Sequence, residues 1–261
     1  RLCNESREMV DSPKIALIDG DILTYRLGFG GQKKLPDGTV EPIPDKVMKH
    51  RVDNFISDML VFHLPAVEDY EGYLSLNSDD NYRHAIAVTA PYKGNRTEMA
   101  KPVHYELIRE HLLTSWEFHG IIGQEADDSL AQEQTRLGNY SVICSIDKDM
   151  LQVPGWHWNF VKREMRYVDE SEGFYNFCIQ LLTGDRTDNI VGIRGIGPAK
   201  AAKCLSQAST SREQLRAVSE VYRQSGDGLL RHFRENCGLL WLRRRTDGAP
   251  ELIEELLKEV Q

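Results

Sequence analysis

Five clusters of acidic residues recur along the chain, and four of them adjoin apolar or helical segments: Asp19 with Asp21, Asp79-Asp80, Glu125–Asp128, Asp147 with Asp149, and Asp185 with Asp188. A single Asp after a strand usually serves a turn or caps a helix, so no cluster is informative alone. Ligands of open α/β sheets, however, bind beyond the carboxyl ends of the strands. We therefore expect these acids to converge on one edge of a sheet.

Apolar patterns predict the elements that carry the acids. Strands are expected at Lys14–Ile18, Tyr73–Leu76, His84–Val88, Tyr140–Ile146 and Trp156–Phe160, and residues 31–45 are expected to be a loop. Helices are expected from Asp45, which would cap the first of them, and over Val103–Trp116 and Glu125–Leu137. From about Phe174 the pattern is helical and ends in an acidic helix at Glu251–Val260. Strands alternating with helices predict an α/β fold with a mostly parallel central sheet flanked by helices.

The composition limits the classes of protein that fit. The 261 residues carry 32 Lys and Arg against 40 Asp and Glu, a net charge of −8, which by itself argues against a nucleic-acid partner. No apolar run approaches the roughly 20 residues of a membrane helix, so we expect a cytoplasmic protein, in the host cytoplasm if it is viral. The five cysteines form no CxxC pair, which argues against a zinc site.

Converging carboxylates imply a particular chemistry. They repel and raise one another's pKa, so a fold tolerates them only where cations neutralise them. Carboxylate oxygens are hard ligands, which favours Mg²⁺ or Mn²⁺. Two such ions about 4 Å apart are the usual device for displacement at phosphorus. The acids therefore indicate phosphodiester hydrolysis, and acids that bind metal also weaken the objection from net charge.

With these clusters in view, the chain resembles the flap endonuclease and 5′ nuclease family, especially bacteriophage 5′→3′ exonucleases and the 5′ nuclease domains of bacterial DNA polymerases. The resemblance covers about residues 14–205. Four acidic motifs stand in the family order: Ile18-Asp19-Gly20, Glu125-Ala126-Asp127-Asp128, Ser145-Ile146-Asp147-Lys148-Asp149 and Gly184-Asp185-Arg186-Thr187-Asp188-Asn189. Two further motifs are Tyr92-Lys93-Gly94-Asn95-Arg96, which resembles the Y-K-x-N-R of the helical clamp, and Gly192-Ile193-Arg194-Gly195-Ile196-Gly197-Pro198, which resembles the helix-three-turn-helix.

The resemblance implies roles for these residues. Five acids would hold the first metal ion directly or through water: Asp19, Asp79, Glu125, Asp127 and Asp128. Four would hold the second: Asp147, Asp149, Asp185 and Asp188. Asp80 is an alternative to Asp79. Lys93 would stabilise the pentacovalent phosphate, with Arg96 as a second cation. Tyr92 would stack an unpaired terminal base.

The glycine-rich motif implies a grip on duplex DNA. Gly192, Gly195 and Gly197 would leave backbone N–H groups free to cradle phosphate, and the family also binds K⁺ at this element. The family's usual Lys is Ala199 here, so Lys200, one position later, is expected to make the phosphate contact.

These implications combine into one expectation. The chain is expected to have a PIN-like 5′ nuclease core over 14–170, with a short helical clamp at about 92–116. A helical DNA-binding region over 171–261 would hold the helix-three-turn-helix at about 184–206. The predicted activity is metal-dependent 5′→3′ exonuclease and flap endonuclease action on double-stranded DNA with a 5′ end or flap, or on RNA·DNA hybrid, by a two-metal mechanism. A monomer in a viral DNA replication setting is expected.

Two alternatives stay open at this point. A haloacid dehalogenase-like phosphatase would use Asp19 as its nucleophile, but it has no use for the clusters at Glu125–Asp128 and Asp147 with Asp149. A catalytically silent module would bind DNA structure through the glycine turns without cutting. PIN-type ribonucleases share the acidic pocket but lack the helix-three-turn-helix.

Overall fold

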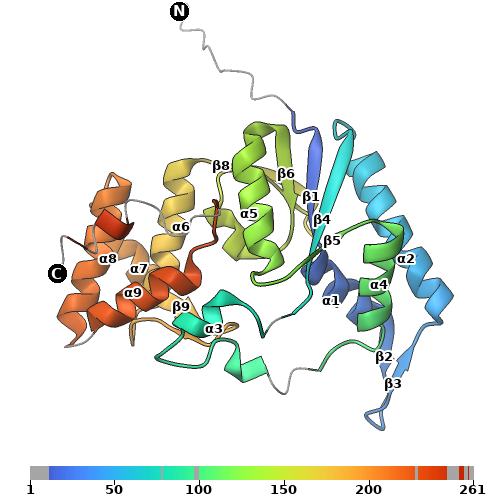
Figure 1. Cartoon of the computed structure of the whole chain (residues 1–261), viewed down its shortest axis with the longest axis horizontal. Coiled ribbons are helices and arrows are strands. Elements are labelled where there is room, and N and C mark those ends of the chain that lie inside the picture. The colour runs from blue at the N-terminus through green and yellow to red at the C-terminus, as the bar shows by residue number, and fades with distance from the viewer. Residues whose placement is uncertain are drawn as a thin grey trace, which may run out of the picture.

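A computed structural model describes residues 12–77, 79–96, 100–226, 229–245, 253–255 and 258. A six-stranded sheet in the order β5-β4-β1-β6-β7-β8 forms its centre (Figure 1). The strands are β1 Ile15–Asp19, β4 Asp69–Ser75, β5 His119–Ile121, β6 Ser141–Cys144, β7 Gly155–Asn159 and β8 Glu164–Val168. All neighbouring pairs are parallel except β7 with β8. The predicted α/β class with a mostly parallel sheet is confirmed.

Helices cover both faces of this sheet. Those on one face are α1 Gly20–Gly30, α2 Asp45–Asp58 with a π-helical extension Met59–His63, and α4 Tyr105–Ser115. The opposite face packs on α5 Ala126–Leu137. Successive side chains of β1 alternate between the two cores, Ala16 and Ile18 toward the first and Leu17 toward the second. A strand buried on both faces needs a continuous apolar run, which is why the sequence identifies it.

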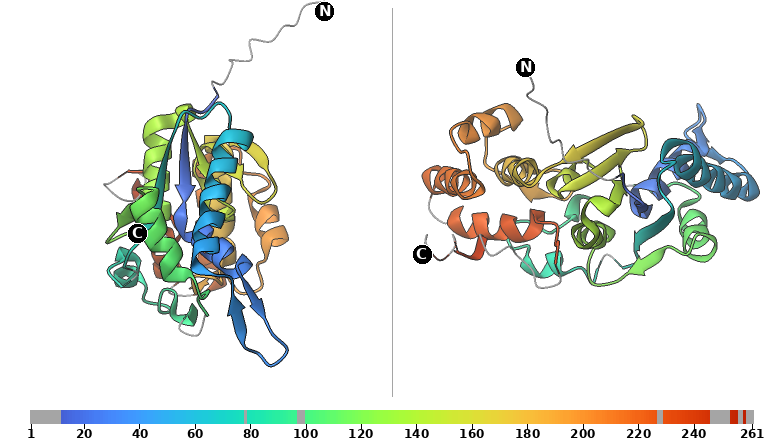
Figure 2. Two further views of the ribbon diagram at one scale, coloured as in Figure 1. Left: turned by 90° about the vertical axis from the view of Figure 1, so that its right-hand side faces the viewer. Right: turned by 90° about the horizontal axis from the view of Figure 1, so that it is seen from above.

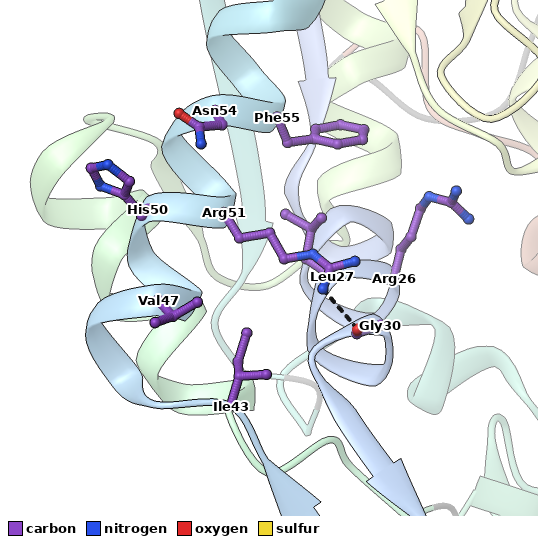
Figure 3. A pocket seen from close by; sticks show the side chains of 9 residues that line it. All are labelled: Arg26, Leu27, Gly30, Ile43, Val47, His50, Arg51, Asn54 and Phe55. Carbon is purple, nitrogen blue, oxygen red and sulfur yellow. Dashed lines mark hydrogen bonds between the residues drawn. The ribbon is translucent and has the colours of Figure 1, made fainter.

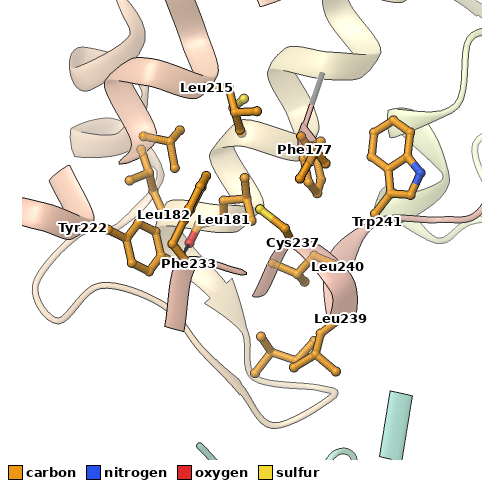
Figure 4. Packing of buried hydrophobic residues seen from close by; sticks show 14 of the residues in the cluster. Phe177, Leu181, Leu182, Leu215, Tyr222, Phe233, Cys237, Leu239, Leu240 and Trp241 are labelled. Atoms are coloured by element: carbon orange, nitrogen blue, oxygen red, sulfur yellow. Dashed lines mark hydrogen bonds between the residues drawn. The ribbon is translucent and has the colours of Figure 1, made fainter. Parts of the chain in front are cut away.

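The second half of the chain adds a helical region beside the sheet, at the end away from α1, α2 and α4 (Figure 2). It contains α6 Glu170–Thr183, α7 Pro198–Leu205, α8 Ser211–Ser225 and α9 Leu229–Leu240, with a short hairpin of β9 Gly184–Asp185 and β10 Ile190–Val191 between α6 and α7. Its core contains Phe177, Leu181, Tyr222 and Phe233 (Figure 4). The helix predicted at Glu251–Val260 lies largely outside the described residues. In the ranges described, no helix combines the length and apolarity needed to cross a membrane.

Three local predictions are wrong. His84–Val88 is not a strand, because Asn81 caps a short helix, α3 Tyr82–Ile86, by accepting from the N–H of Arg83 at 3.0 Å. Residues 31–45 include a hairpin of β2 Gln32–Lys34 and β3 Val40–Pro42. Asp45 does not cap α2, since it is the first helical residue and its carboxylate lies 3.2 Å from Nε2 of His104.

Candidate active site

The carboxylates of three segments meet at the carboxyl edge of the sheet. Asp19 ends β1, Asp127 lies in the first turn of α5, and Asp147 caps a 3₁₀ helix, Lys148–Gln152, that follows β6. Asp19 is fully buried, and its carboxylate accepts from Oγ of Ser145 at 2.6 Å. Because β1 and β6 are parallel neighbours, their carboxyl ends share one edge.

At this edge, burial and repulsion between carboxylates outweigh the charge of the nearby Lys93. Burial, with the charges of Asp21 and Asp147, raises the pKa of Asp19 to about 7, although hydrogen bonds from Ser145 and from the N–H of Ile22 act to lower it. Burial also raises the pKa of Asp127, with Asp19, Asp147 and Glu125 adding to the effect. These carboxylates are therefore close enough to repel one another, as the sequence predicts for a cation-binding edge.

A second pair of acids lies next to this group. Burial, followed by the charge of Asp147, raises the pKa of Asp149 to about 8. Asp185, in β9, keeps a pKa below its usual range, because hydrogen bonds from Asp149 and from the N–H of Thr187 outweigh its burial. One oxygen of Asp149, Oδ1, is buried without a hydrogen-bond partner. Nζ of Lys148 lies 3.8 Å from this oxygen, so a cation already faces it without a hydrogen bond.

Glu125 and Asp188 differ from the other acids because cations already contact them. Nζ of Lys93 pairs with Oε1 of Glu125 and lies 3.9 Å from Oδ2 of Asp188, and Arg96 pairs with Oδ1 of Asp188. Burial raises the pKa of Glu125, but Lys93 and Arg83 bring it below its ordinary value. Burial keeps the pKa of Asp188 raised despite the two cations beside it.

Tyr92 lies beneath this ion-pair group. Its hydroxyl bonds to Glu125 at 2.9 Å and to Asp188 at 2.8 Å, and its side chain is only 4% exposed. The ring contacts His84 edge-on. In this arrangement the ring is not accessible to a terminal base, so the structure gives Tyr92 a role in holding the two carboxylates rather than the stacking role predicted.

Asp128, predicted as a metal ligand, faces a cation that the sequence did not reveal. Arg83 contacts both oxygens of Asp128, at 2.6 and 2.9 Å, and the N–H of Arg243 donates to Oδ1 at 2.9 Å. The pKa of Arg83 is raised, because Asp128 outweighs its burial. A lone arginine beside a loop is usually exposed, so no local pattern could have found this pair.

Arg83 and two other buried side chains also bind the end of α9 and the residues that follow it, 239–243. Side chains, and not another strand, make the hydrogen bonds to five of this segment's backbone N–H and C=O groups. Arg83 donates to the carbonyls of Leu239 and Trp241, Gln152 donates to the carbonyl of Leu240 and accepts from the N–H of Leu242, and Asp128 accepts from the N–H of Arg243. The C-terminal helices are therefore attached directly behind the acidic edge.

Two further polar residues near this edge were not predicted as site residues. Asp21, in the first turn of α1, accepts from the N–H of Ser75 at 3.1 Å and from Nη1 of Arg109 at 2.8 Å. Arg109 belongs to α4, whose Ile108 and Leu112 are buried in the core of the sheet. The second half of the range predicted as a clamp is therefore a helix packed on the core.

The remaining predicted residues are exposed, except that Gly192 is half-buried against the backbone of Thr183 and Gly184. Asp79 and Asp80 both lie on the loop after β4, and the choice between them stays a prediction. Gly192, Gly195 and Gly197 lie in the turns before α7, where Gly195 has φ +80° and open space around it. Nζ of Lys200 donates to the carbonyl of Gly195 at 2.8 Å, so this cation lies beside the turn.

A separate concavity lies between α1 and α2 (Figure 3). It has a volume of about 690 Å³ and is lined by Arg26, His50 and Arg51 above the apolar side chains of Leu27 and Phe55. Arg51 donates to the carbonyl of Gly30 at 2.8 Å. None of the predicted site residues lines it.

The acids are not preformed as a chelate. Among the residues that the structure describes, no three acidic, histidine or cysteine side chains are arranged so that they could hold a metal ion. The reason is visible in the contacts above, because Glu125 and Asp188 are turned onto cations and Asp128 onto Arg83.

Comparison with solved structures defines the class of the fold. The bacteriophage T5 D15 protein, co-crystallized with metal ions, superimposes with a TM-score of 0.60 at 15% identity, over 95% of this chain and 98% of that one. Flap endonuclease-1 from Methanococcus jannaschii gives a TM-score of 0.56 at 14% identity, over 95% of this chain and 87% of that one. The fold is that of the 5′ nucleases, as the sequence predicts.

Sequence relatives then identify the family. A flap endonuclease Xni from Photorhabdus laumondii is 30% identical over 179 residues, which are 62% of this chain and 68% of that protein. A 5′-3′ exonuclease from Mycoplasma genitalium is 27% identical over 76% of this chain and 73% of its own length. A DNA polymerase I from Borreliella burgdorferi is 36% identical over 102 residues, only 11% of that protein. No protein-family model matches. The chain belongs to the flap endonuclease and 5′-3′ exonuclease family.

The Arg83–Asp128 pair generates a prediction about stability. Arg83→Met leaves a buried carboxylate without its cation, which should lower the free energy of unfolding by about 3–5 kcal/mol. Adding Asp128→Leu should recover part of that loss, because the double variant has no unpaired buried charge. Urea unfolding of both variants and the wild type measures this. A double variant no more stable than the single one would contradict it.

The raised pKa of Asp19 generates a prediction about pH. Unfolded Asp19 releases its proton near pH 3.8, whereas folded Asp19 keeps it up to about pH 7. The folded state therefore binds more protons in this window, and in the presence of a chelator its stability should fall as the pH rises through it. Asp19→Asn should make the melting temperature less dependent on pH, whereas Asp58→Asn, on an exposed site, should not. If the melting temperature depended on pH equally in the wild type and both variants, Asp19 would not be the source of the pH dependence.

Proposed function

We propose that this protein is a divalent-cation-dependent nuclease that hydrolyses DNA phosphodiester bonds near 5′ ends, acting as a 5′→3′ exonuclease and a flap endonuclease. The observation that carries the proposal is the gathering of mutually repelling carboxylates at one sheet edge, with the ammonium of Lys93 beside them. Membership of the family supports nuclease chemistry. An RNA·DNA hybrid is a second candidate substrate.

The carboxylates divide into two sets of proposed ligands. Asp19, Glu125 and Asp127, with Asp79 or Asp80, would hold one ion, and Asp147, Asp149, Asp185 and Asp188 the other. The oxygen donors suit Mg²⁺ or Mn²⁺. Oδ1 of Asp149 supports the fit, because it is buried without a hydrogen bond and Nζ of Lys148 faces it at 3.8 Å. Bound divalent ions supply an activated water and stabilise the leaving oxygen. We assign Asp128 to Arg83, so that it orients the first turn of α5 instead of binding metal directly.

Lys93 and Arg96 are proposed to act on the scissile phosphate. Without a divalent ion they neutralise Glu125 and Asp188, so cation binding must compete with these ion pairs. Once released, the ammonium of Lys93 is available to stabilise the negative charge that develops on the phosphate oxygens. Arg96 provides a second cation, and Tyr92 keeps the two carboxylates aligned.

Grip on the duplex is proposed for the turns before α7. Gly195 and Gly197 are exposed where a sequence-independent phosphate contact is needed, and Lys200 adds a cation there. Gly192 is half-buried and allows the start of the turn to pack against Thr183 and Gly184. Binding of K⁺ at these turns is part of the same proposal. This contact is separate from the acidic edge, so loss of cleavage and loss of binding are separable.

Cleavage tests the proposal directly. DNA duplex, 5′-flap and RNA·DNA substrates labelled at either end are incubated with Mg²⁺, Mn²⁺ or EDTA, and the products are resolved by length. Metal-dependent release from the 5′ side is expected, and Asp147→Asn and Asp185→Asn should abolish it while DNA binding is kept, because each removes charge from the metal site. Binding without cleavage by the wild type would favour the structural module, and full turnover by the variants would exclude these ligands.

Lys93→Ala gives a second test. Because the ammonium is proposed to act on the transition state, its loss should lower kcat by about two to three orders of magnitude, a size typical of lost electrostatic stabilisation. Affinity for DNA, measured in EDTA, should change little. A loss confined to affinity would make Lys93 a binding residue.

A further inference from the structure

Two side-chain amides join the turn that bears Lys93 to the loop that bears Asp185 and Asp188. Nδ2 of Asn189 donates to the carbonyl of Pro91 at 2.9 Å. Nδ2 of Asn95 donates to the carbonyl of Arg186 at 2.6 Å. Each segment thus supplies one amide and accepts the other, although about ninety residues separate them in the sequence. We call Asn95 and Asn189 the amide pair.

The backbone between these contacts is held in an uncommon conformation. Lys93 has φ +54° and Asn189 has φ +60°, both in the left-handed region. Asn adopts this region more readily than most residues, whereas Lys pays a steric cost there. Such a conformation persists only where the surroundings fix it. Here the N–H of Lys93 donates to the carbonyl of Asp188 at 2.9 Å, so both strained residues lie within the docked region.

The close approach of the two segments also depends on Gly94, which lies between Lys93 and Asn95. A side-chain Cβ at Gly94 would lie 3.0 Å from Cβ of Pro91 and 3.6 Å from Nδ2 of Asn189. The turn therefore fits tightly against the second loop, and Lys93, only 19% exposed, extends from it between Glu125 and Asp188. The position of its ammonium follows from how this turn is docked.

We propose that Asn95 and Asn189 are positioning residues, which set the ammonium of Lys93 relative to both groups of carboxylates by docking its turn. This inference rests on the proposed function, in which Lys93 acts on the phosphate. Both amides donate to backbone carbonyls, so they influence the reaction through Lys93. Both positions require a hydrogen-bond donor. A carboxylate there would place a second acceptor against the backbone carbonyl oxygen.

Three variants distinguish the contribution of the side-chain amide donor from that of the left-handed backbone conformation. Asn95→Asp and Asn189→Asp keep the size of the side chain and replace the donor with an acceptor. Asn189→Gly keeps the left-handed backbone accessible and removes the donor. Asn139→Asp is the matched control, because Asn139 is exposed on a turn outside the site. Melting temperatures establish that each variant is folded.

The first measurement does not depend on activity. Each protein, without DNA or divalent ions, is treated with an amine-acylating reagent, and the acylation of Lys93 relative to the exposed Lys162 is quantified by peptide mass spectrometry. Loss of one hydrogen bond should raise the relative rate at Lys93 about fivefold in the three variants and leave it unchanged in Asn139→Asp. Unchanged reactivity at Lys93 in folded variants would overturn the proposal.

The second measurement links docking to the reaction. The same three variants should lower kcat about fivefold or more while the Kd for DNA in EDTA stays within about twofold of the wild type. Wild-type behaviour of Asn189→Gly in both measurements would show that only the backbone conformation matters, and would overturn the role of the amide. A wild type that cleaves nothing, with Lys93 reactivity still raised in the variants, would refute the proposed function but not the docking.

Discussion

Repulsion between buried carboxylates is the constraint on which the arrangement of this protein depends. Asp19, Asp127 and Asp149 lie close together with raised pKa values and no contact from Arg83, Lys93 or Arg96, whereas Glu125, Asp128 and Asp188 are each paired with one of these cations. A chain with net charge −8 thus places three of its cations at one edge. The acids that these three cations do not contact are the ones best suited to exchange a proton for a metal ion.

The two signs of charge come from different parts of the chain. The acids are contributed by the end of β1, the start of α5, the turn after β6 and the hairpin after α6. The cations Arg83, Lys93, Arg96 and Arg109 all lie in the single connection between β4 and β5. One crossover therefore supplies the cations that pair with acids of α1, of the start of α5 and of the hairpin after α6. Asp19 at the end of β1 and the acids after β6 pair with none of these four cations.

The sequence predicts the parts of this site that depend on local pattern. Asp19 and Asp147 follow apolar strands, and the parallel pairing of β1 with β6 is enough to bring them together. The sequence does not predict the parts of the site that depend on contacts between distant residues. Arg83, for example, pairs with Asp128, which lies 45 positions away in the chain. His84–Val88 has the alternation of a strand, yet the Asn81 cap and the buried guanidinium of Arg83 make its first residues helical. The pairing of Lys93 with Glu125 likewise follows from tertiary structure, since the motif alone indicates only a cation near phosphate.

The segment after α9 has a consequence for how the molecule opens. Its backbone groups at Trp241, Leu242 and Arg243 are bonded by Arg83, Gln152 and Asp128 in place of a neighbouring strand. If α9 left its position, the buried guanidinium of Arg83 and the buried amide of Gln152 would each lose a backbone carbonyl acceptor directly behind the carboxylates, which costs free energy. The helices beside the sheet and the acidic edge therefore belong to one cooperative unit in hydrogen exchange, and amides on both should gain or lose protection together.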